Sequence, residues 1–122
     1  MSEKTVAAKL QIKDGYGVLF VGHADAAALV GELPQGAHQV ATPTDADAAV
    51  IFVADRAELD ERSAGLGSLT SAKAVWLCYP KGNTTNLNRD SVRTILAFAD
   101  WEVVTNVSVD GTWSALRAKY IA

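Results

Sequence analysis

The chain has 122 residues, of which 49% are hydrophobic and 20% are charged, and its formal net charge is -3. This length and composition predict one soluble globular domain over residues 1–122, with a loose segment at 1–6. A mildly acidic chain without a concentrated basic run argues against a nucleic-acid partner. The longest uncharged apolar run, Ala48–Ala54, is too short to span a bilayer. Cys78 is the only cysteine, which excludes a disulfide framework and favours a reducing, cytoplasmic location.

The first half of the chain predicts strands that alternate with helices. The apolar run Tyr16–Val21 predicts a strand buried on both faces, as is typical of parallel strands covered by helices. After Gly22, the alanine-rich segment Ala24–Leu33 predicts a short helix. Ala37–Ala41 predicts a weak second strand, and Ala49–Ala54 predicts the most apolar strand of the protein.

The second half continues this alternation. Asp55 and Glu58 have the spacing of a capping pair and predict a helix over Arg56–Ala64. Ala74–Tyr79 predicts a fourth strand, and Arg89–Ala99 predicts an amphipathic helix because its apolar residues recur at helical spacing. The strands and helices predict a buried core that includes Leu19, Val21, Ile51, Val53, Val75, Leu77, Ile95 and Leu96.

The C-terminal residues predict a β-hairpin. Valines alternate with polar residues over 103–109, Asp110 and Gly111 fit a two-residue turn, and Thr112–Tyr120 returns as the second arm. Strands that alternate with helices and close in such a hairpin indicate an α/β fold. We expect a small three-layer Rossmann-like sheet, mainly parallel, with a C-terminal antiparallel β-hairpin.

This order of elements, with a strand that ends in Pro80-Lys81-Gly82, resembles the second half of the S-adenosylmethionine-dependent methyltransferase fold. A terminal antiparallel hairpin is the hallmark of that fold, and the segment Lys9–Gly15 is similar to the lead-in to its first strand. The resemblance implies a sheet ordered second, first, third, fourth and returning arm, with the strand at Val103–Val109 outermost.

A second resemblance is to a family of short actinobacterial proteins known only as a domain of unknown function. It rests on four segments of this chain: Ala8–Leu10, Asp55–Leu59, Tyr79–Gly82 and Thr112–Leu116. This resemblance implies no particular activity.

The chain departs from the methyltransferase pattern at two places. A glycine-rich turn of the G-x-G-x-x-G type is reduced to Gly22, and Ala24 and Ala26 add β-carbons where glycines allow close approach of the backbone. The acidic residue that binds the cofactor ribose after the second strand is replaced by Ala41, Thr42 and Pro43. We therefore expect no tight binding of S-adenosylmethionine, no methyl transfer and no resident cofactor.

In an open α/β sheet, ligands bind beyond the carboxyl ends of the parallel strands. The predicted strands bring eight candidate residues for a small anionic ligand to this edge: Gly22, His23, Asp55, Arg56, Lys81, Gly82, Asp110 and Trp113. Arg56 and Lys81 carry the positive charge for such an anion. Asp55 equally suits a helix cap, and Trp113 equally suits a core or interface position. We identify no catalytic constellation and no metal-ligand spacing in the sequence.

The sequence leaves three functions open. The first is a small cytoplasmic binding or regulatory module without catalytic activity, whose partner is a small anionic ligand or another protein. The second is a minimal methyltransferase-like enzyme that uses the same crevice. The third is a structural subunit that forms a homodimer through an exposed edge of the sheet.

Overall fold

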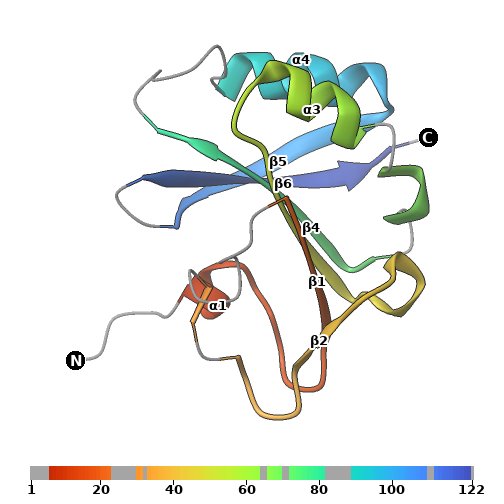
Figure 1. Ribbon diagram of the computed structural model, residues 1–122, viewed down its shortest axis with the longest axis vertical. Coiled ribbons are helices and arrows are strands. Elements are labelled where there is room, and N and C mark those ends of the chain that lie inside the picture. Colours follow the sequence, from red (N-terminus) through yellow and green to blue (C-terminus); the bar gives the residue numbers. More distant parts are fainter. Residues whose placement is uncertain are drawn as a thin grey trace.

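The computed structural model describes residues 6–22, 30–31, 33–63, 66–69, 72–81, 89–109 and 112–121. These residues form one six-stranded sheet. Its strands are β1 (Gly17–Val21), β2 (His38–Val40), β3 (Ala48–Phe52), β4 (Ala74–Pro80), β5 (Trp101–Ser108) and β6 (Trp113–Tyr120). The described helices are α1 (Val6–Lys9), α3 (Arg56–Ser63) and α4 (Arg89–Phe98), with short 3-10 helices η1 (Pro43–Asp45) and η2 (Leu66–Leu69) (Figure 1).

The strands follow the order β2-β1-β3-β4-β6-β5, which confirms the predicted order. The pairs formed by β1 with β2, β1 with β3 and β3 with β4 are parallel. The last strand, β6, returns antiparallel between β4 and β5, with Leu116 opposite Leu77. The sheet is therefore mainly parallel and closes in the antiparallel hairpin that the sequence predicts.

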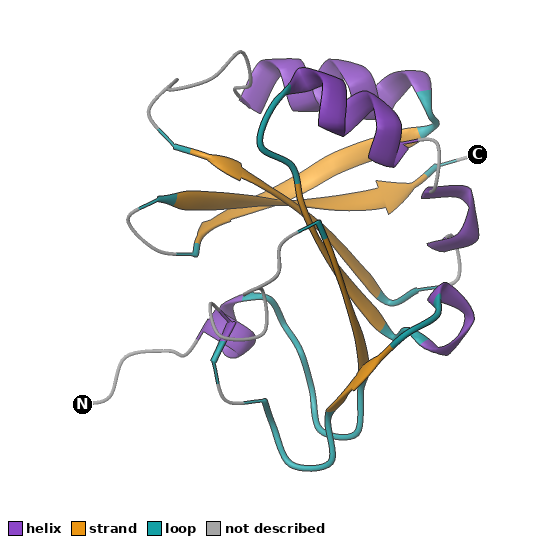
Figure 2. Cartoon of the chain, in the orientation of Figure 1, coloured by secondary structure: helices purple, strands orange, loops and turns teal. Residues whose placement is uncertain are grey.

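Helices cover both faces of the sheet and produce three layers. Figures 1 and 2 show α3 and α4 together on one face and α1 on the other. On the first face, Leu59 of α3 and Leu96 of α4 belong to the same buried cluster as Ile51 of β3. On the second face, Leu10 lies in a cluster with Trp76, whose indole Nε1 donates a hydrogen bond of 2.8 Å to the Leu10 carbonyl. This bond connects the end of α1 to the centre of the sheet. None of the described helices is long and apolar enough to cross a membrane.

Several boundaries differ from the prediction. Val6, expected to be loose, begins α1, while residues 1–5 lie outside the described part. The helix expected over 24–33 lies largely outside it too. Of that segment Val30 has helical backbone, and Gly31 has a left-handed φ of +81°, which is incompatible with an α-helix that continues through Gly31 to Leu33. The outermost strand begins at Trp101 instead of Val103, because Trp101 pairs with Tyr120.

Residues 41–47, which connect β2 to β3, contain η1 and no α-helix. Val40 and Ala46 pack against the cluster on the α3 and α4 face, so the connection crosses β1 on that side. The Asp47 carboxylate accepts a hydrogen bond of 2.9 Å from the Gly17 amide, and this bond fixes the last residue of the connection against the start of β1. Because so short a connection cannot cover β1 fully, Val21 is half-buried, whereas the other seven predicted core residues are buried.

Candidate functional site

Gly22 turns the chain at the carboxyl end of β1. Its φ is +88°, and a β-carbon at this position would lie only 2.1 Å from the carbonyl oxygen of Phe52, at the end of β3. Any residue with a side chain is excluded here by both the backbone conformation and the contact. The exposed backbone of Gly22 therefore lies against the end of the neighbouring strand, while His23 is outside the described residues.

The end of β4 and the start of β6 bring Lys81 and Trp113 to the same edge. The Lys81 amide donates a hydrogen bond of 2.8 Å to the Thr112 carbonyl, and its Nζ donates to the Ser108 hydroxyl. The Trp113 ring stands edge-on to the ring of Phe52, with centroids 5.0 Å apart and planes at 88°. Phe52 is thus in contact with Trp113 and adjoins the Gly22 turn. Gly82 and Asp110, also predicted at this edge, lie outside the described residues.

Asp55 and Arg56 begin α3 directly after β3. The Asp55 carboxylate accepts a hydrogen bond of 2.9 Å from the Glu58 amide, which confirms the capping interpretation. Arg56 lines a cavity of about 340 Å³ together with Asp60 of its own helix and Phe98 of α4. This cavity lies between the two helices, so Arg56 belongs to the helical layer. The capping hydrogen bond accounts for Asp55 without a ligand.

A second cavity, of about 290 Å³, lies beside the last residues of β1 on the α3 face of the sheet. Apolar side chains from β1, β3 and η1 form much of its lining, and polar side chains come from α3 and η2: Leu19, Val21, Pro43, Ile51, Arg62 and Ser68. Glu61 adds a carboxylate to the same lining. The volume is at the lower end of the range of small-molecule sites. Val21 is the last residue of β1 and immediately precedes Gly22, so one end of this cavity reaches the end of that strand, while Glu61, Arg62 and Ser68 line it over the face of the sheet.

Arg62 is a candidate residue that the sequence analysis missed. Its Nε atom is buried and has no hydrogen-bond partner among the residues that the structure describes, whereas buried donors in proteins are nearly always paired. A guanidinium binds carboxylates and phosphates through parallel N–H donors, so an unpaired donor beside a cavity suits an oxyanion. The sequence signal is weak, because a cation in the last turn of a helix is already explained by the helix dipole.

The carboxylates that follow β2 are engaged in its connection to β3. Asp45 accepts a hydrogen bond of 2.8 Å from the Thr42 hydroxyl. Asp47 accepts from the Gly17 amide, and its other oxygen lies 3.6 Å from the Lys73 ammonium. Neither carboxylate therefore replaces the ribose-binding acid of the methyltransferase pattern.

No family model and no curated protein matches the chain. Among solved structures, a Streptococcus agalactiae protein of the NADB-Rossmann superfamily superposes with a TM-score of 0.61 at 13% identity, over 99% of this chain and 70% of that one. The B. subtilis M1A22 tRNA methyltransferase TrmK superposes with a TM-score of 0.58 at 16% identity, over 98% of this chain and 67% of that one. These similarities confirm a Rossmann-like, methyltransferase-like fold. The resemblance to the short actinobacterial family stays a prediction.

Proposed function

We propose that this chain is a minimal methyltransferase-like protein that binds a ligand of the S-adenosylmethionine class at the carboxyl edge of its parallel strands. The observation that carries the proposal is the Gly22 turn, whose missing β-carbon lets the backbone lie against the Phe52 carbonyl. A tight glycine turn after the first strand is the place where Rossmann-like folds bind nucleotide ligands, and in this chain the missing β-carbon of that turn faces the end of β3. The likeness to a solved tRNA methyltransferase adds support and favours this function over the non-catalytic module that the sequence suggested.

The residues around the adjoining cavity suit the parts of such a ligand. Arg62 lines the cavity, and its guanidinium suits the carboxylate of the amino-acid group of such a ligand. Glu61 suits ribose hydroxyls, which donate hydrogen bonds to a carboxylate, and the apolar lining formed by Leu19, Val21 and Ile51 suits a planar ring. When bound, the ligand supplies a methyl group activated by its sulfonium. The contribution of this chain is to bind the ligand, orient it and exclude water around it.

A second candidate is a module that binds such a ligand without transferring its methyl group. The observation in its favour is the engagement of Asp45 and Asp47 within the connection from β2 to β3. Loss of a buried hydrogen-bond partner costs ~1–3 kcal/mol, or roughly ten- to a hundredfold in affinity. Weak binding without turnover is the expected behaviour of that candidate.

Titration calorimetry with S-adenosylmethionine and S-adenosylhomocysteine tests the proposal. We expect both to bind with micromolar dissociation constants, and Arg62→Met to weaken binding of both at least tenfold. Arg93→Met is the matched control, since Arg93 is an exposed residue one turn into α4 that lines neither cavity. Formation of S-adenosylhomocysteine with bulk tRNA as the acceptor supports the enzyme, whereas tight binding without turnover supports the second candidate. Absence of binding at millimolar ligand overturns both.

A further inference from the structure

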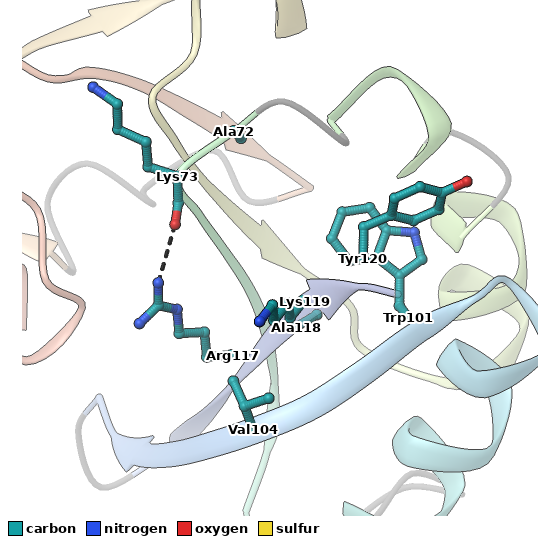
Figure 3. Close-up of a pocket in the computed structure, with 8 residues that line it drawn as sticks. All are labelled: Ala72, Lys73, Trp101, Val104, Arg117, Ala118, Lys119 and Tyr120. Atoms are coloured by element: carbon teal, nitrogen blue, oxygen red, sulfur yellow. Dashed lines mark hydrogen bonds between the residues drawn. The ribbon is translucent and has the colours of Figure 1, made fainter. Parts of the chain in front are cut away.

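A groove with several cationic side chains lies at the opposite edge of the sheet, where the parallel strands begin. It consists of two adjoining depressions of about 520 and 470 Å³ that share Lys73 and Arg117. Figure 3 shows the first, which Lys119, Trp101 and Tyr120 also line. Lys13, Tyr16 and Gln11 line the second. The four cations come from three separate parts of the chain, so the sequence gives no sign that they lie together.

Arg117 is the residue between the two depressions, and it is held in place by neutral acceptors. Its Nη2 donates a hydrogen bond of 3.0 Å to the Lys73 carbonyl (Figure 3), and its Nη1 donates to the side-chain oxygen of Gln11. Neither bond neutralises the guanidinium. Arg117 is therefore a fixed positive charge that faces both halves of the groove.

The other charges near the groove leave an excess of positive charge. Among the described residues that line the two depressions, none is acidic. The Lys73 ammonium lies 3.6 Å from the Asp47 carboxylate and 5.2 Å from the centroid of the Tyr16 ring. Glu102 stands directly opposite Lys119 in the β5–β6 ladder, so its carboxylate offsets part of that charge. Lys13 and Arg117 have no carboxylate opposite them among the residues that line the groove.

An aromatic surface lies beside these cations. The ring of Tyr120 packs against Trp101 at a centroid distance of 5.4 Å and an angle of 57°, as Figure 3 shows. Trp101 is buried, whereas 39% of Tyr120 is exposed. The tyrosine ring therefore packs against Trp101 and is also accessible to a ligand. Positive grooves that follow a phosphate backbone, combined with rings on which bases stack, are typical of proteins that bind single-stranded nucleic acids.

We propose that this groove binds single-stranded nucleic acid. Lys13, Lys73, Arg117 and Lys119 contact phosphates, and a base stacks on Tyr120. The two depressions meet at Lys73 and Arg117, so a flexible single strand can follow them around this edge of the sheet, while an acidic membrane surface calls for a flat or convex face. The proposal differs from the expectation drawn from the net charge of -3, because a net charge says nothing about how charges are distributed. The groove and the proposed ligand site lie at opposite edges of the sheet, so both can be occupied together.

The test is fluorescence anisotropy with a labelled oligouridine of about 12 nucleotides, within the range of site sizes for single-strand binders. We expect the logarithm of the association constant to fall linearly with the logarithm of the salt concentration. The slope should be about -2 to -3 for three or four phosphate contacts. The double variant Lys13→Glu, Lys119→Glu is expected to bind at least tenfold more weakly with a shallower slope. Both lysines are exposed, so circular dichroism should show an unchanged fold.

The charge-matched control is the double variant Arg56→Glu, Arg89→Glu, which changes two exposed arginines at the starts of α3 and α4 that line neither depression of the groove. We expect this control to bind oligouridine with unchanged affinity. The proposal is overturned if both double variants weaken oligouridine binding equally, or if the wild type does not bind at low salt. A third outcome is that oligouridine does not bind, while vesicles rich in phosphatidylserine bind the wild type and not the double variant Lys13→Glu, Lys119→Glu. That outcome overturns the proposal and would assign the groove to a membrane instead. Tyr120→Ala is expected to weaken oligouridine binding about tenfold and Tyr120→Phe to leave it unchanged.

Discussion

Gly22 and Phe52 approach so closely that a β-carbon on residue 22 would lie 2.1 Å from the Phe52 carbonyl oxygen. Gly15 has a similar left-handed φ of +78°, but a β-carbon there would meet no atom within 4 Å. The two glycines therefore separate the cost of a left-handed backbone from the cost of a steric contact.

Gly22→Ala is expected to lower the free energy of unfolding by more than ~2 kcal/mol, because strain and clash add. Gly15→Ala carries the strain alone and should cost ~1–2 kcal/mol. Urea denaturation of both variants measures the difference. Equal losses of unfolding free energy in the two variants would show that the carboxyl end of β1 moves freely away from Phe52. That result contradicts the described turn.

Ile51→Ala and Leu77→Ala should each lower the free energy of unfolding by ~2–5 kcal/mol. Both side chains are buried on the face that α3 and α4 cover, and truncation leaves a cavity there. Val104→Ala is the control, because Val104 is 46% exposed on the outer strand and its truncation should cost under ~0.5 kcal/mol. A loss below about 1 kcal/mol at both core sites would be incompatible with this packing.

Asp55→Ala should lower the free energy of unfolding by ~0.5–2 kcal/mol, because the Glu58 amide loses its capping acceptor. Asp55→Ser keeps a capping oxygen and should recover most of this loss. Chemical denaturation of the three proteins checks the order. If serine and alanine destabilise equally, the role of Asp55 lies elsewhere than in the cap.

The parts of the fold that depend on local sequence could be predicted. The strands at the centre of the sheet are uninterrupted apolar runs, and the Asp55 cap requires residues only three apart. The strand order also follows, because the chain resembles a known arrangement. The half-buried state of Val21 could not be predicted, since it depends on how the connection at 41–47 crosses β1.

The candidate sites show the same limit. Gly22 could be found because a glycine between an apolar strand and an alanine-rich segment is visible in the sequence. Arg62 could not, because its significance lies in a buried, unpaired Nε beside a cavity lined by residues from five elements. The basic groove could not be found either, since Lys13 and Arg117 are brought together only by the pairing of distant strands.

The most direct test of the proposed ligand site is a two-dimensional ¹H–¹⁵N NMR titration with S-adenosylmethionine. We expect the largest shift changes at Gly22 and in the residues around the adjoining cavity, Val21, Arg62 and Leu69 among them. Amides near Arg117, at the opposite edge of the sheet, should stay unchanged. Saturable shifts confined to the Gly22 edge are the predicted result. No shifts at millimolar ligand, or shifts only around Arg117, would contradict the assignment of this edge as the site of an S-adenosylmethionine-class ligand.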